Sequence, residues 1–96
     1  MAALDLLGRR WSLRVLWELC DGPVGARALI ERCDGVSSSV LYDRLRELTA
    51  AGLIDKDDGG AYQLTDVGAG LGDAFAPLEE WSHLWAKRQS QRESQP

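Results

Sequence analysis

The strongest structural signal in this chain lies in residues 25–51, which read Gly25-Ala-Arg-Ala-Leu-Ile-Glu-Arg-Cys-Asp-Gly-Val-Ser-Ser-Ser-Val-Leu-Tyr-Asp-Arg-Leu-Arg-Glu-Leu-Thr-Ala-Ala51. Over residues 25–33 the apolar positions recur at helical spacing and form one stripe: Ala26, Leu29, Ile30 and Cys33. Asp34-Gly35 follows directly and favours a tight turn that ends the helix. The first half of the stretch therefore predicts a helix followed by a turn.

The second half of the stretch predicts a longer helix. Ser37 is a favourable N-cap because its hydroxyl can accept an unpaired backbone N–H, and Gly52 closes the helix after about Ala51. The inner face consists of Leu41, Leu45 and Leu48, and the opposite face reads Ser39, Tyr42, Asp43 and Arg46. Two helices joined by a short glycine-containing turn are typical of a helix-turn-helix.

The residues after residue 52 predict a β-hairpin and a final helix. Residues 53–56 and 61–64 are short β-prone runs, and Asp57-Asp-Gly-Gly60 between them favours a tight turn. Thr65 is expected to cap a last helix that continues to about Lys87.

Two further helices are expected before residue 25. The first covers residues 2–7, and Ser12 is expected to cap the second. The apolar face of that second helix is predicted to consist of Leu13, Leu16, Trp17 and Cys20. Asp21-Gly-Pro23 then breaks the helix.

This order of elements is that of a winged helix, in which the hairpin is the wing. The predicted fold class is mainly α with a small β-hairpin (α+β), a winged helix-turn-helix with N- and C-terminal dimerisation helices. Residues 1–88 are expected to form this single domain, and the polar residues 89–96 are expected to be a disordered tail.

Composition excludes several classes of protein. The chain has 96 residues, 45% of them hydrophobic and 27% charged, which suits one small globular domain. No apolar run is long enough to span a membrane, and no signal peptide is recognised, so the cytoplasm is the expected compartment.

The charges are unevenly distributed along the chain. The net charge is −4, yet residues 1–46 have a charge balance of +1 and residues 47–86 have one of −7. A DNA-binding surface is therefore expected in the first half.

The reactive residue types do not form a catalytic or metal-binding pattern. His83 is the only histidine, and no catalytic triad, phosphate-binding loop or dinucleotide motif is present. We therefore expect no enzyme activity, no cofactor and no metal site. Cys20 and Cys33 are expected to be small buried hydrophobic residues, with a redox sensor as the alternative.

Several segments resemble HxlR-type transcriptional regulators. The matching pieces are Ala3–Ser12 with its Gly-x-x-Trp-Ser step, Asp21–Pro23, Gly35–Ser37, Val40-Leu41, Arg44–Leu48, Ala51–Ile54 and Tyr62–Gly68. The resemblance covers about residues 2–87, and it implies a dimeric winged-helix DNA-binding regulator from bacteria or archaea. This sequence departs from the family in its short acidic wing, Asp57–Gly60, and in having serine at both positions 38 and 39.

The candidate DNA-binding residues are Ser37, Ser38, Ser39, Tyr42, Asp43, Arg44, Arg46 and Lys56. Arg46 is expected to pair with guanine in the major groove, whereas serine and tyrosine can bond bases or phosphates. Asp43 is expected either to accept from a cytosine amino group or to restrain Arg46 or Arg44. Arg44 lies toward the flank, where pairing with a wing acid is the alternative. Lys56 is either a single phosphate contact or a solvated lysine.

The apolar residues of the terminal helices predict a homodimer interface formed by Leu4, Leu7, Phe75, Leu78, Trp81 and Trp85. Four tryptophans in so short a chain are also compatible with a pocket for a small-molecule effector, whose candidate residues are Trp11, Trp17 and Trp81.

The sequence thus predicts a transcriptional regulator that binds double-stranded DNA as a homodimer on an inverted-repeat operator. The alternative is a winged-helix protein-interaction module with weak or no DNA binding, in which the acidic half binds a basic partner. Salt-dependent DNA binding distinguishes the two.

Overall fold

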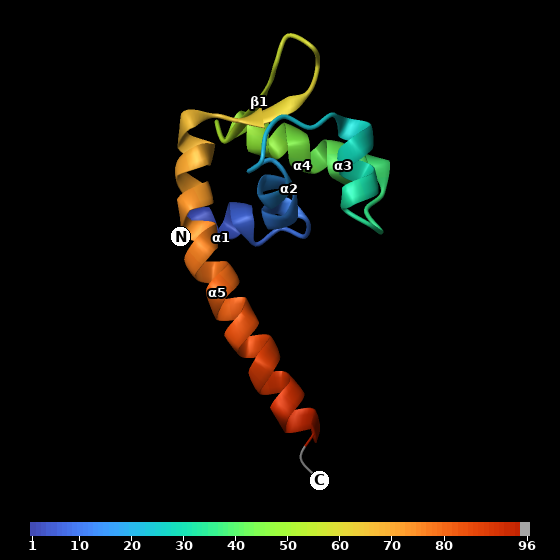
Figure 1. Ribbon diagram of the computed structural model, residues 1–96. Helices are drawn as coiled ribbons and strands as arrows, with labels where there is room; N and C mark the ends of the chain where they lie inside the picture. The colour runs from blue at the N-terminus through green and yellow to red at the C-terminus, as the bar shows by residue number, and fades with distance from the viewer. Residues whose placement is uncertain (95–96) are drawn as a thin grey trace.

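A computed structural model describes residues 1–94, and Gln95 and Pro96, at the end of the predicted tail, lie outside the described residues. The elements follow in the order α1 (Ala2–Leu7), α2 (Ser12–Glu18), α3 (Ala26–Arg32), α4 (Ser38–Ala50), β1 (Ile54–Lys56), β2 (Tyr62–Leu64) and α5 (Asp66–Ser94) (Figure 1). The fold is mainly helical with one antiparallel hairpin, so the predicted winged helix-turn-helix is confirmed.

The core lies between α2, α3, α4 and the hairpin. The inner leucines of α4 are fully buried as predicted, with at most 1% of their surface exposed. Leu29 and Cys33 of the α3 segment are also buried, and Ile54 and Tyr62 close the core from the hairpin. Each fully buried leucine contributes about 1.5–3 kcal/mol of hydrophobic free energy, so this packing holds α4 in place against the rest of the core.

The buried face of α2 differs from the prediction. The residues in the core are Ser12, Val15, Leu16 and Leu19. Leu13 and Trp17 are 38% and 46% exposed, and Cys20 is exposed as well. Only Arg14 and Glu18 interrupt the apolar residues between Leu13 and Cys20, so two apolar stripes adjoin on α2. The stripe one position away from the predicted one packs into the core. The predicted face, apart from Leu16, lies toward α5 and stays exposed.

The start of α2 also differs from the prediction. Trp11 is the N-cap, with a left-handed φ of 78° and no side-chain capping bond. Ser12 is already the first helical residue, and its buried Oγ has no hydrogen-bond partner within the described chain. The predicted Ser12 cap is therefore wrong, whereas Ser37 caps α4 as predicted, since its Oγ accepts the Val40 N–H at 3.2 Å.

The wing is a short and locally stabilised hairpin. In its register Ile54 lies opposite Leu64, and Lys56 lies opposite Tyr62. The Asp57 carboxylate accepts backbone N–H groups of Gly59 and Ala61, both at 2.9 Å, which orders the acidic turn. Val24 pairs with Tyr62 on the other edge of β2, and this bridge ties the start of α3 to the base of the wing.

A tight joint connects the wing to α5. The Thr65 hydroxyl donates to the Gly52 carbonyl at 2.6 Å and accepts the Gly68 N–H at 3.2 Å, so Thr65 caps α5 as predicted. Gly68 is packed so closely that an added Cβ would lie 2.1 Å from the carbonyl oxygen of Leu53. Only glycine fits there without moving α5 away from β1.

Helix α5 continues to Ser94, well past the predicted end near Lys87. Residues 89–94 are therefore helical rather than the disordered tail that the sequence suggested. Glutamine, arginine and glutamate are good helix formers, and extension of an existing helix avoids the cost of nucleation. The second half of α5 projects away from the other elements (Figure 1). Among residues 1–94, no helix is both long and apolar enough to cross a bilayer.

Candidate nucleic-acid interface

The outward face of α4 is polar and open. Its leucines are turned into the core, which leaves Ser38, Ser39, Tyr42 and Arg46 exposed on the other side. The Arg46 side chain is 71% exposed and Tyr42 is 43% exposed. An exposed helix with this composition fits the major groove of DNA, where arginine and hydroxyl groups reach base edges and phosphates.

The N-terminal end of α4 gathers three serines. Ser37, Ser38 and Ser39 are all exposed, and the Oγ atoms of Ser37 and Ser39 lie 3.4 Å apart. The unpaired N–H groups and the partial positive charge of a helix N-terminus attract phosphate. This end of α4 therefore combines hydroxyl donors with a favourable electrostatic field.

Arg44 lies on the flank of α4, away from the outward face. Its side chain is 14% exposed and its Nη1 is 2.6 Å from Glu47. Arg9, from the loop between α1 and α2, contacts the same glutamate at 3.3 Å. The partner of Arg44 is therefore Glu47 of its own helix, because the i,i+3 spacing brings these two side chains together. The predicted alternative, in which Arg44 pairs with an acid of the wing, is wrong.

Asp43 and Arg46 form an ion pair on the outward face. The Asp43 side chain is 49% exposed, and the pair again has i,i+3 spacing. Of the three possibilities for Asp43, restraint of Arg46 is the one that the geometry of the free protein supports.

Lys56 lies beside a hollow between α4 and the wing. Its Nζ is 5.3 Å from the centre of the Tyr62 ring, in a cation–π arrangement. The hollow is lined by Leu45, Arg46, Thr49, Ala50, Lys56 and Tyr62. Thr49 was missed by the sequence analysis, although it follows Arg46 by three residues and so continues the same helix face.

The predicted dimer residues form an apolar surface on one chain. Leu4, Leu78, Trp81 and Trp85 are 66%, 46%, 56% and 53% exposed, whereas Leu7 and Phe75 are partly buried. The rings of Trp81 and Trp85 stack with their centres 5.9 Å apart. Leu84, which is 52% exposed, was not among the predicted residues.

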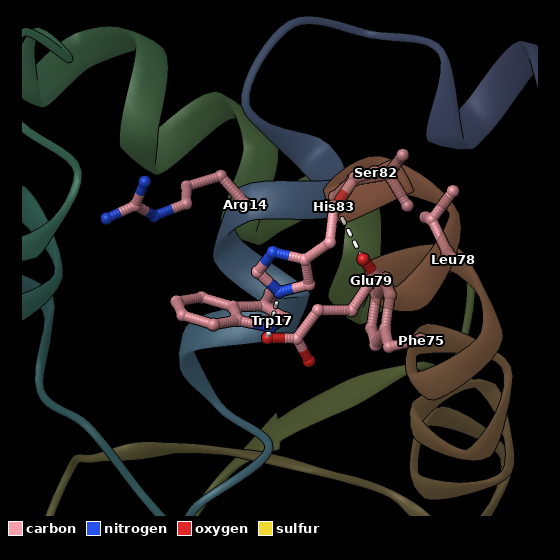
Figure 2. A pocket seen from close by; sticks show the side chains of 8 residues that line it. Arg14, Trp17, Phe75, Leu78, Glu79, Ser82 and His83 are labelled. Atoms are coloured by element: carbon pink, nitrogen blue, oxygen red, sulfur yellow. Dashed lines mark hydrogen bonds and ion pairs between the residues drawn. The ribbon is translucent and has the colours of Figure 1, made fainter. Parts of the chain in front are cut away.

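The three tryptophans proposed for an effector pocket do not meet in one chain. Trp17 lines a hollow of about 500 Å³ between α2 and α5, with Phe75, Leu78 and Glu79 (Figure 2). His83 lies 3.8 Å from Glu79 at this hollow. Arg14 also lines it, with its guanidinium carbon 5.6 Å from the centre of the Trp17 ring. Trp11 lines a different hollow beside α1, and Trp81 lines neither.

The two cysteines lie in different environments. Cys33 is fully buried as predicted, but Cys20 is exposed, because the predicted face of α2 turns outward. Burial raises the pKa of the Cys33 thiol, and the charge of Glu18 adds to this effect while Arg14 opposes it. Partial burial of the sulfur raises the pKa of Cys20 too, helped by Asp21.

The chain is similar to known transcriptional regulators. YvaP, an HTH-type transcriptional regulator of Bacillus subtilis, is 27% identical over 89 residues, which cover 86% of this chain and 82% of YvaP. The HTH-type transcriptional regulator YodB of the same organism is 28% identical over 87 residues, covering 84% of this chain and 78% of YodB.

Solved structures agree with this similarity. The quinone-bound structure of YodB superposes with a TM-score of 0.79 at 29% identity, over 86% of this chain and 92% of YodB. The reduced form of the redox regulator HypR has the same TM-score at 23% identity, over 95% of this chain and 94% of HypR, and so shows the shared fold.

The model of the HxlR-like helix-turn-helix family matches residues 6–90, from α1 almost to the end of α5. The match includes the whole helix-turn-helix, the wing and the terminal helix described above. It agrees with the resemblance seen in the sequence, and the family consists of transcriptional regulators rather than enzymes. This chain belongs to the HxlR-like helix-turn-helix family.

Proposed function

We propose that the protein binds a specific double-stranded DNA operator as a homodimer and thereby regulates transcription in the cytoplasm. The observation that carries this proposal is the exposed polar face of α4, with Arg46 at its centre and the Ser37 cap at its start. In a winged helix this face enters the major groove.

Each residue of the face has a distinct role in the proposal. Arg46 donates to a guanine, Tyr42 bonds a base or a phosphate, and Ser37 to Ser39 hold a phosphate at the helix N-terminus. Lys56 supplies one phosphate contact per subunit from the base of the wing. Arg44 takes no direct part because its side chain is only 14% exposed and is held by Glu47 on the flank of the helix.

A second copy of the chain is the proposed cover for the apolar residues of α1 and α5. Soluble proteins rarely leave a large apolar patch open, and aromatic side chains are enriched where identical subunits meet. A two-fold axis through this surface relates the two α4 helices, which then reach half-sites about 34 Å apart on one side of the duplex. The operator is therefore an inverted repeat.

An effector site is the remaining part of the proposal. The relative YodB has been solved with a quinone bound. In this chain the hollow between α2 and α5, with Trp17 and Phe75 in its wall, is the proposed place for a small planar effector. Thermal melting with a panel of quinones tests this, and a Trp17→Ala variant should lose any stabilisation that the wild type shows.

The test of DNA binding is a salt titration. Fluorescence anisotropy with labelled duplexes from the region upstream of the gene should show an affinity that falls steeply as the salt concentration rises. The reason is that protein binding releases the cations condensed on the DNA phosphates. Arg46→Ala should weaken specific binding by about 1–3 kcal/mol, the value of one lost base contact. Arg92→Ala is the matched control, since it removes the same charge near the end of α5. Equal loss in both variants would contradict the role of Arg46.

A protein-interaction module is the second candidate, and the acidic turn of the wing favours it. Asp57 and Asp58 repel phosphate, and residues 47–86 are strongly acidic. If no duplex from the upstream region or from a random-sequence pool binds at low salt, this second candidate replaces the first.

A further inference from the structure

The outward face of α4 contains a carboxylate where DNA phosphates are expected to approach. Asp43 is 49% exposed and forms an ion pair with Arg46. An exposed i,i+3 pair adds little to the stability of a folded protein. A negative charge on this face lowers the affinity for any duplex, so the presence of Asp43 needs an explanation at the level of binding.

Arg46 is the arginine through which Asp43 can act on DNA. The other arginine of α4, Arg44, has a side chain that is 14% exposed and is held by Glu47 at 2.6 Å. Arg46, in contrast, is 71% exposed, and Asp43 accepts from only one of its terminal nitrogens, Nη2. The remaining N–H groups of the guanidinium stay available as donors.

An unrestrained arginine at a protein–DNA interface has two competing targets. A phosphate offers two oxygens and a full negative charge, whereas a guanine offers O6 and N7 and no net charge. A phosphate that approaches Arg46 also approaches the Asp43 carboxylate, and the two negative charges repel each other within the Debye length of about 10 Å. Guanine meets no such repulsion, so Asp43 penalises the phosphate contact more than the guanine contact.

We propose that Asp43 is a specificity-determining residue that keeps Arg46 from DNA phosphates and leaves it available to a guanine of the operator. This inference rests on the proposed DNA-binding function and deepens it. Asp43 acts through Arg46, so it is a positioning residue. It lowers the total affinity for DNA and raises the preference for one base.

The test compares Asp43→Asn with a control of equal charge. Glu31→Gln removes one carboxylate from α3, where Glu31 is exposed and makes no ion pair among the described residues. Two measurements are made on the intact wild-type chain and on both variants. The first is a salt titration on a short mixed-sequence duplex, and the second is selection from a pool of random-sequence duplexes followed by sequencing.

Asp43→Asn should release Arg46 to phosphate. The slope of log K against log salt on the mixed-sequence duplex should steepen by about 0.9 per subunit, as expected for one more phosphate neutralised. In the selection, the wild type should prefer guanine at one position of each half-site, and the variant should lose about fivefold or more of that preference. Glu31→Gln should change neither quantity appreciably.

The outcomes separate this inference from the function on which it rests. If the wild type binds no DNA, the proposed function fails and this inference fails with it. If the wild type selects a sequence but Asp43→Asn leaves both the slope and the guanine preference unchanged, this inference alone is overturned. If Glu31→Gln produces the same changes as Asp43→Asn, net charge explains them and the inference is again overturned.

Discussion

Replacement of Gly68 by alanine should destabilise the protein, although Gly68 lies in a helix, where alanine is intrinsically favoured. The new Cβ would lie 2.1 Å from the Leu53 carbonyl oxygen, far inside the roughly 3.5 Å at which such atoms normally touch. Relief of this clash requires α5 to move away from β1. That movement strains two hydrogen bonds, from Thr65 N to Leu53 O at 3.0 Å and from Thr65 Oγ1 to Gly52 O at 2.6 Å.

The expected magnitude follows from these terms. Overpacking costs about 1–3 kcal/mol and each weakened hydrogen bond about 1 kcal/mol, while alanine recovers about 1 kcal/mol of helix propensity. The net loss is about 2–4 kcal/mol, or a fall in Tm of roughly 10–25 °C for a domain of this size. Urea and thermal unfolding at one fixed protein concentration measure it, since the proposed dimer would make the stability concentration-dependent.

A matched control lies two positions further along α5, on a different face of the helix. Gly70 has no atom within 4 Å of the place where a Cβ would be, so Gly70→Ala should stabilise the protein by about 0.5–1 kcal/mol. The reasoning about the joint would be refuted if Gly68→Ala proved as stable as Gly70→Ala.

Replacement of Asp57 and Asp58 by asparagine should raise the affinity for mixed-sequence duplexes and steepen its salt dependence, measured by anisotropy; unchanged values would mean that the turn is remote from DNA. Truncation before Leu78 should abolish dimers in light scattering together with operator binding. A monomeric intact chain at micromolar concentration would contradict the proposed interface. Because the pKa of each thiol is raised, little thiolate exists at neutral pH. Cys20 should therefore react slowly with a disulfide reagent and faster as the pH rises, whereas Cys33 should react only on unfolding. Prompt labelling of Cys33 in the folded protein would argue against its burial.

The sequence predicted α4 and the wing well because each has a signal with one solution. Leu41, Leu45 and Leu48 are separated by polar residues, so only one face of the helix can be buried. Asp57–Gly60 stands between two β-prone runs, so the turn can form in only one place. In both cases the polar residues exclude the alternatives, and the periodicity decides the structure.

Helix α2 was predicted less well because its pattern has two solutions. The apolar stripe containing Leu13 and Trp17 and the stripe containing Val15 and Leu19 are both spaced like a helix face. Helical periodicity does not distinguish them, and packing against α3 and α4 selects the second. Ser12 was predicted to be the N-cap because nothing in the local sequence shows that the helix already begins at Ser12, with Trp11 as its N-cap.

The ion pairs of the candidate site could be predicted only in part. Arg46 and Asp43 are close in sequence, so their pairing is a local property of a helix. The contact from Arg9 to Glu47 joins residues that are 38 positions apart, and it depends on how the loop after α1 crosses α4. Such contacts follow from tertiary packing, which a single sequence does not display.

Helix α4 keeps its folding residues and its proposed reading residues on separate faces, and this separation has a consequence for how the regulator can change its target. The leucines and the Arg44–Glu47 pair hold the helix in place, whereas positions 39, 42 and 46 contribute little to that support. Substitutions at exposed positions usually change stability by less than about 0.5 kcal/mol. Under the proposed function, single mutations at these positions can therefore change the operator preference without loss of the fold. Duplicated copies of such a gene can then diverge in the promoters they recognise, and a designer can exchange the same three side chains on an unaltered scaffold.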